Sequence, residues 1–127
     1  MDSETSALSG KRALLIEDEM LVAMLIEDML TDAGCVLAGS ASRLSDALVM
    51  AGDDALEADF AILDVNLAGE ASFAVAEVLA RRGLPFAFST GYGAHGLPEV
   101  WRGRPVLQKP FTAAEVQTIL ERIVSGG

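Results

Sequence analysis

Five short apolar segments alternate with segments of helical periodicity along the chain, and this alternation restricts the fold more than any other feature. The apolar segments are predicted strands, and they lie at 13–16, 35–41, 59–64, 85–90 and 105–109. Strands that alternate with helices form a parallel sheet, because right-handed crossovers return the chain to the same end of the sheet each time. We therefore predict an α/β fold, with a doubly wound five-stranded parallel sheet and helices on both faces.

Helices are predicted between these strands and after the last one. The predicted helices cover 19–33, 43–51, 70–82 and a final segment that begins after residue 112. The first ends at Gly34, Ser42 leads the second, and Thr112 with Glu115 matches the pattern of a capping box. A further helix is due at 91–103, but four glycines and one proline there argue against a stable one.

Length, charge and cysteine content narrow the class of protein. The 127 residues are enough for one domain with its own core, which we expect at 12–125 behind a flexible, polar N-terminal tail at 1–11. No apolar run reaches the ~20 residues that a membrane-spanning helix needs. The net charge of −10 argues against nucleic acid as a partner, because phosphate binding needs a basic face. Cys35 is the single cysteine, which suits a reducing cytoplasm.

Polar side chains stand at the carboxyl ends of four predicted strands. Glu17 and Asp18 follow the first strand, and Asp64, Thr90 and Lys109 end the third, fourth and fifth. Doubly wound sheets bind ligands outside these strand ends, so we expect the five side chains to lie together. Carboxylates that approach one another repel unless a cation lies among them, and a set of oxygen ligands favours Mg²⁺.

The lysine and the threonine indicate what this site could do. Phosphoryl transfer is catalysed mainly by positioning and by charge neutralisation, and an ammonium and a hydroxyl suit both purposes. A carboxylate can itself accept a phosphoryl group as an acyl phosphate, and Asp64, at the end of the central strand, is best placed to do so. Each residue alone has a structural explanation, such as turn formation or helix capping, but their joint placement on four strands argues against coincidence.

The motifs that carry these residues resemble a known family. "LLIEDE", "ILDVNL", "STG" and "LQKPF" are similar to the four signatures of the response-regulator receiver domain of two-component signalling. The resemblance covers residues 12–125, and it implies a flavodoxin-like (CheY-like) fold with strand order 2-1-3-4-5. Within it, "RGLPFAFSTGYG" resembles the single-domain FAT GUY subclass.

The family resemblance also implies a role for each site residue. It implies phosphorylation of Asp64, metal binding directly by Asp18 and Asp64, largely through water by Glu17 and through the backbone carbonyl of Asn66, and phosphoryl contacts from Thr90 and Lys109. The sequence departs from the usual receiver at Glu17, where Asp is more common, in the loop "NLAGE", at Val106, where an aromatic is usual, and in the glycine-rich segment 91–103.

Two surface functions follow as predictions. Val106 has no ring or hydroxyl that could move, so we predict that the conformational switch involves 91–103, with Thr90 and Tyr92 as its candidates. Met20, Ala23 and Met24 lie outside the predicted core stripe of the first helix, and they are either casual surface residues or a docking face for the phosphoryl donor. For His95 we expect a surface role, and for Trp101 a packing role that holds 91–103 on the sheet.

Three functions remain to be weighed. The leading one is a stand-alone response regulator that takes a phosphoryl group from a sensor histidine kinase or a histidine phosphotransfer protein, and that signals through protein contact or acts as a phosphate sink. The alternative is a Mg²⁺-dependent phosphatase with an aspartyl-phosphate intermediate. Such enzymes carry a second Asp two residues after the nucleophile and a cap insertion, whereas this chain has Asn66 and no long insertion. A pseudo-receiver scaffold is disfavoured because all the reactive groups are present.

Overall fold

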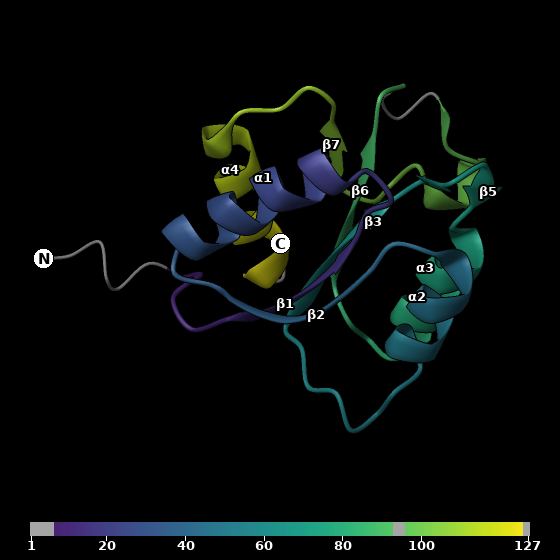
Figure 1. Ribbon diagram of the computed structural model, residues 1–127, viewed down its shortest axis with the longest axis horizontal. Coiled ribbons are helices and arrows are strands. Elements are labelled where there is room, and N and C mark those ends of the chain that lie inside the picture. Colours follow the sequence, from purple (N-terminus) through teal and green to yellow (C-terminus); the bar gives the residue numbers. More distant parts are fainter. Residues whose placement is uncertain (1–6, 93–95, 126–127) are drawn as a thin grey trace, which may run out of the picture.

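The computed structural model, which describes residues 7–92 and 96–125, shows a five-stranded parallel sheet between two layers of helices (Figure 1). The strands of this sheet are β1 (Arg12–Ile16), β2 (Val36–Ala41), β3 (Phe60–Asp64), β6 (Phe86–Thr90) and β7 (Val106–Gln108), and the α-helices are α1 (Met20–Asp32), α2 (Leu44–Ala51), α3 (Phe73–Arg81) and α4 (Ala113–Val124). The strand order is β2-β1-β3-β6-β7, which is the predicted order 2-1-3-4-5 once the small hairpin β4–β5 is set aside. The fold prediction is therefore confirmed.

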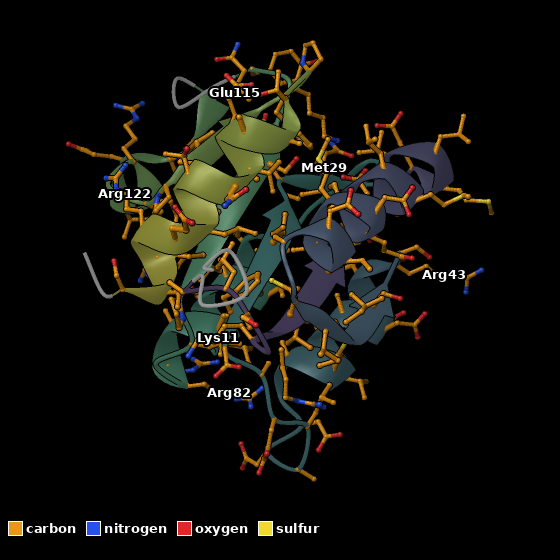
Figure 2. All side chains as sticks on the ribbon, turned by 90° about the vertical axis from the view of Figure 1, so that its left-hand side faces the viewer. Lys11, Met29, Arg43, Arg82, Glu115 and Arg122 are labelled. Atoms are coloured by element: carbon orange, nitrogen blue, oxygen red, sulfur yellow. The ribbon has the colours of Figure 1, made fainter. Side chains whose placement is uncertain are left out.

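Each face of the sheet has its own core. Leu14, Ile16 and Phe88 pack with α2 and α3, while Leu15, Ile62 and Leu107 pack with α1 and α4. Figure 1 shows these two helical layers on opposite sides of the strands, and Figure 2 looks onto the α1–α4 layer, with Met29 between the two helices. None of the described helices is long and apolar enough to cross a membrane.

The structure corrects the predicted start of the third helix. Glu70 and Ala71 form strand β5 (Glu70–Ala71), which pairs antiparallel with β4 (Asn66–Leu67), and the helix begins only at Phe73. The two linking residues, Ala68 and Gly69, have φ angles of 53° and 90°. Two successive left-handed residues are what a two-residue hairpin turn needs. Glu70 and Ala71, which helical periodicity had assigned to the third helix, therefore belong to the hairpin instead.

The described part of 91–103 contains no α-helix. Its regular structure is a 3₁₀ turn, η3 (Glu99–Trp101). Trp101 is 8% exposed and lies edge-on to Phe86 and Phe88 at centroid distances of 6.1 and 6.0 Å, so the expected packing of this residue onto the sheet is observed. His95 lies outside the described residues.

Two helix starts differ in their capping. Thr112 and Glu115 form the predicted capping box, with hydrogen bonds of 2.8 and 3.1 Å that satisfy two free amides at the start of α4. The second helix instead has Arg43 at its N-cap, with no side-chain cap, so Ser42 is not the capping residue.

Packing begins before residue 12. Leu8 is fully buried in the α1–α4 core, and its carbonyl accepts hydrogen bonds from Lys11 N (3.1 Å) and Cys35 Sγ (3.5 Å). Gly10 N also donates to Gly34 O at 2.8 Å. The expected tail of 1–11 thus contains at least one core residue, and residues 1–6 lie outside the described part of the chain.

Candidate functional site

Strand register places three polar side chains next to one another at the carboxyl edge of the sheet. Ile16 of β1 pairs with Leu63 of β3, so the residues that follow them, Glu17 and Asp64, leave the sheet side by side. Asp64 in turn pairs with Ser89 of β6. Asp64 and Glu17 are 5% and 3% exposed, so the carboxylates are held in a largely dry setting at the rim of the sheet.

Lys109 joins these acids. Its Nζ lies 3.0 Å from Asp64 Oδ2 and 3.5 Å from Glu19 Oε1. Both carboxylate oxygens of Glu17 lie 3.3 Å from the same nitrogen, but only Oε2 has hydrogen-bond geometry, so Oε1 interacts with the ammonium through charge alone. The ammonium is therefore surrounded by three carboxylates from β3 and from the segment after β1.

The pKa of Glu17 and that of Lys109 both rise in this cluster. Burial raises the pKa of Glu17 to about 7, and the neighbouring Asp64 adds to the shift, while Lys109 opposes it. Burial alone would lower the pKa of Lys109, but the hydrogen bond and charge of Asp64, followed by Glu17, raise it. The site thus keeps its lysine charged and makes one acid unusually easy to protonate.

Asp18 is tied to the hairpin rather than to Lys109. Its Oδ2 accepts a hydrogen bond of 2.8 Å from the backbone N–H of Ala68. Burial works to raise the pKa of Asp18, but this hydrogen bond, a further backbone hydrogen bond, a hydrogen bond with Asp64 and the charge of Lys109 together outweigh it, so the pKa is lowered. The Asn66 side chain closes the hairpin from the other side by accepting a bond of 2.8 Å from Gly69 N.

The backbone and carboxylate of Asp64 are both fixed. Ser72, fully buried, donates from Oγ to the Asp64 carbonyl at 2.6 Å, and Asn66 N donates to Asp64 Oδ1 at 3.2 Å. On the neighbouring strand, Thr90 is 5% exposed, and its Oγ1 accepts a hydrogen bond of 3.1 Å from Tyr92 N. All five predicted strand-end residues therefore lie at one edge of the sheet.

A cleft of about 500 Å³ opens over this edge. It is lined by Asp18, Glu19, Asp64, Val65, Asn66, Thr90, Gly91, Tyr92 and Lys109. Among the described residues, the carboxylates of Glu17, Asp18 and Glu19 bring oxygen atoms within 4.8 Å of one another. Asp64 stands outside that group and is paired with Lys109 instead. An all-oxygen, acidic donor set of this kind suits a hard divalent cation such as Mg²⁺.

The exposed face of α1 is wider than the sequence indicated. Met20 and Met24 are 76% and 55% exposed, as expected for residues outside the core stripe, but Ala23 is half-buried and packs against the α1–α4 core. Leu21 and Leu25, which the periodicity had placed in the core stripe, are exposed instead. The helix turns Val22, Ile26 and Met29 inward, so only one residue of each of the predicted pairs 21/22 and 25/26 belongs to the core stripe.

Fold and site together define a class of protein: a doubly wound α/β domain with acids and a lysine around one strand-end aspartate. No protein-family model matches the chain, and no match was found among curated proteins. Solved structures do match. SdrG from Sphingomonas melonis Fr1 is 42% identical, with a TM-score of 0.79 over 94% of this chain and 99% of that chain. SdrG in a BeF3-activated conformation, from Pseudomonas melonis Fr1, is 38% identical over 94% of this chain and 98% of that chain, with a TM-score of 0.76.

Two further structures have the same fold. The response regulator REC domain of PhyR from Erythrobacter litoralis is 28% identical over 94% of each chain, with a TM-score of 0.78. The receiver domain of the sensor histidine kinase PA1611 from Pseudomonas aeruginosa PAO1, which has a magnesium ion coordinated in its active site cleft, is 25% identical over 92% and 99%, also with a TM-score of 0.78. The chain belongs to the receiver-domain family of response regulators, as its motifs indicated, and the match to SdrG along almost the whole chain agrees with the predicted subclass.

Some residues of the site were not predicted. Ser72 and Ala68 hold Asp64 and Asp18 through backbone hydrogen bonds, and Ser89 lies beside Asp64. Gly69 was the one local signal for a turn before Glu70, since Ala68 is not a typical turn residue. Nothing in the residue types marks a serine that bonds to a backbone carbonyl eight positions earlier.

Proposed function

We propose that the chain is a phosphoryl-accepting signalling domain in which Asp64 takes a phosphoryl group from a phosphohistidine donor, with Mg²⁺ bound beside it. The observation that carries this proposal is the hydrogen-bonded ion pair between Lys109 Nζ and Asp64 Oδ2, at 3.0 Å. It holds a cation at a strand-end carboxylate whose backbone carbonyl accepts a hydrogen bond from Ser72. A phosphoryl group on Asp64 would thus meet a positive charge already in place.

Each site residue has a role in this chemistry. An oxygen of Asp64 attacks the phosphorus while the bond to the imidazole nitrogen breaks. Lys109 neutralises the charge on the phosphoryl oxygens, and the Thr90 hydroxyl donates to one of them. Asp18 and Asp64 would hold Mg²⁺ directly, Glu17 largely through water, and Asn66 through its backbone carbonyl. The ion would supply further charge neutralisation, in keeping with the magnesium in the cleft of the PA1611 receiver domain.

The donor is a sensor histidine kinase or a histidine phosphotransfer protein in the cytoplasm. We propose that it docks on α1, where Met20 and Met24 form the predicted face and the exposed Leu21 and Leu25 extend it. This helix begins three residues after Glu17, so a partner on it lies next to the cleft. The phosphorylated domain signals through contact with another protein or acts as a phosphate sink. Neither nucleic acid nor a membrane is a partner in this proposal.

The phosphatase alternative has weaker support. The position two residues after Asp64 is Asn66, which cannot act as a general acid. Between β3 and α3 the described chain forms only the β4–β5 hairpin and no cap. A signalling role also agrees with the receiver domains to which the chain is similar.

Labelling with acetyl phosphate tests the proposal. With Mg²⁺ present, the wild-type chain is expected to gain one phosphoryl group that is stable in acid and labile in base, and Asp64→Asn is expected to abolish it. Ser125→Ala, at the C-terminal end of α4 and outside the residues that line the cleft, serves as a control and is expected to retain labelling. Labelling of Asp64→Asn at the wild-type rate would show that another residue is the acceptor.

A further inference from the structure

Within the described residues, two buried side-chain oxygens lack a hydrogen-bond partner, and they flank Asp64 on opposite sides. They are Glu17 Oε1 and Ser89 Oγ. Glu17 Oε1 is compensated by the ammonium of Lys109 at 3.3 Å. Ser89 is fully buried and its hydroxyl has no such compensation. A buried hydroxyl without a partner destabilises a fold, so its presence calls for an explanation, such as a partner in another state of the protein.

The sheet places this hydroxyl on the same side as the Asp64 carboxylate. Asp64 and Ser89 are register partners on parallel strands, and such partners project to the same face. The pair before them, Ile62 and Ala87, lies in the α1–α4 core, and so does Leu107, the partner of Ser89 on β7. Ser89 therefore points into the α1–α4 side of the site, at the level of Asp64.

Lys109 is bound to Asp64 in the resting structure. It follows β7, whereas Asp64 ends β3, and β6 lies between them, so the lysine side chain crosses the end of β6 to reach Asp64. Both oxygens of Asp64 already have donors: Oδ1 accepts from Asn66 N, and Oδ2 accepts from Lys109 Nζ. The Ser89 hydroxyl makes no hydrogen bond to Asp64 in this state, in which Lys109 is bound to Oδ2.

We propose that Ser89 is a positioning residue for the phosphorylated state. Its hydroxyl donates a hydrogen bond to the Asp64 carboxyl oxygen that Lys109 releases when the ammonium turns to the phosphoryl group. The inference rests on the proposed phosphorylation of Asp64. The resting state carries a buried hydroxyl without a partner and the phosphorylated state satisfies it, so Ser89 shifts the balance between the two states toward the phosphorylated one.

Beryllofluoride with Mg²⁺, used as a phosphoryl mimic on the whole chain, tests this inference. Ser89→Ala is expected to weaken beryllofluoride binding by about three- to tenfold, as the loss of one hydrogen bond implies. The melting temperature of the resting protein is expected to stay the same or rise, because the unpartnered hydroxyl is gone. Ser89→Cys, of similar volume but with a weak donor, is expected to show the same loss of affinity.

Ser72→Ala is the matched control. Ser72 is equally buried, but its hydroxyl already donates to Asp64 O in the resting state. This variant is expected to lower the resting melting temperature by a few degrees, because it removes a hydrogen bond that the resting protein already has. Wild-type affinity in Ser89→Ala, or a resting destabilisation like that of Ser72→Ala, would overturn the role of Ser89. Failure of the wild-type chain to bind beryllofluoride would overturn the proposed function itself, and this inference with it.

Discussion

At the scale of single residues, Glu17 is the group whose charge depends most on its surroundings. Its carboxylate is buried beside Asp64, and its pKa of about 7 lies well above the ordinary 4.5. Between these two values the folded protein holds a proton that the unfolded chain releases. Stability therefore falls as the pH rises through this window, and the loss is complete above about pH 7.

The raised pKa of Glu17 predicts that stability depends on pH, and that Glu17→Gln removes this dependence. In metal-free buffer we expect the free energy of unfolding of the wild-type protein to fall by about 2 kcal/mol between pH 5 and pH 8, in excess of any change in Glu17→Gln. Urea denaturation across this range measures it. Glu19→Gln, at an exposed neighbour, should keep the wild-type slope, and equal slopes in all three proteins would contradict the buried, protonatable state of Glu17.

At the scale of elements, the exposed face of α1 has a specific predicted consequence. Met20→Lys with Met24→Lys is expected to slow phosphotransfer from the cognate donor about tenfold or more, because two apolar anchors are replaced by solvated charges. Labelling by acetyl phosphate should be unchanged, since that small donor needs no docking face. A pair of lysines at Val36 and Val49, which are 47% and 74% exposed on other elements, is the control. Parallel losses with both donors would mean that the helix is only structural.

The segment after β6 is the predicted switch element. Thr90 Oγ1 accepts from Tyr92 N, and Tyr92 lies against the backbone at Gly96, where an added Cβ would come within 3.2 Å of the Tyr92 Cβ. A pull on Thr90 by a phosphoryl oxygen thus has a direct path into this segment. We expect amide exchange over 91–103 to slow several-fold with beryllofluoride and Mg²⁺.

Tyr92→Ala should abolish this slowing and leave Asp64 labelling intact, whereas Tyr92→Phe should behave as wild type. Hydrogen exchange read by mass spectrometry measures both variants. If protection changes elsewhere and 91–103 stays as it was, the switch uses another route.

Some features of the strands and helices could be predicted from the sequence, and others could not. The strand ends were predictable because strand order and alternation fix which side chains meet at the carboxyl edge, as the contact of Lys109 with Asp64 illustrates. The hairpin at 66–71 could not be predicted, because its turn depends on a left-handed conformation at Ala68. Alanine rarely adopts this conformation, so the residue type gives no signal for it. In α1, periodicity could not show which residue of each apolar pair is turned inward, because Leu21 and Leu25 have the same helical spacing as Val22 and Ile26.

At the scale of the whole molecule, the core extends to Leu8. Leu8→Ala is expected to cost about 2–4 kcal/mol of stability, since it empties a fully buried site. Leu21→Ala, the same change at a side chain that is 81% exposed, should cost under about 0.5 kcal/mol. Denaturant titration of both variants measures the difference, and equal values would place Leu8 in a tail without packing. The sequence could not reveal this leucine because one apolar residue among polar ones has no periodicity.

The hydrogen bond from Ala68 N to Asp18 Oδ2 provides a backbone signal that would change when metal binds at the proposed site. The Ala68 amide and a Mg²⁺ ion draw on the same carboxylate, so an ion that takes Asp18 Oδ2 must alter or break a bond that is 2.8 Å long in the free protein. Amide proton resonances are sensitive to the length of such bonds. A single backbone amide signal from the hairpin tip is therefore expected to report occupancy of the proposed metal site, so that a titration can be followed without a dye, a fluorophore or a coupled assay.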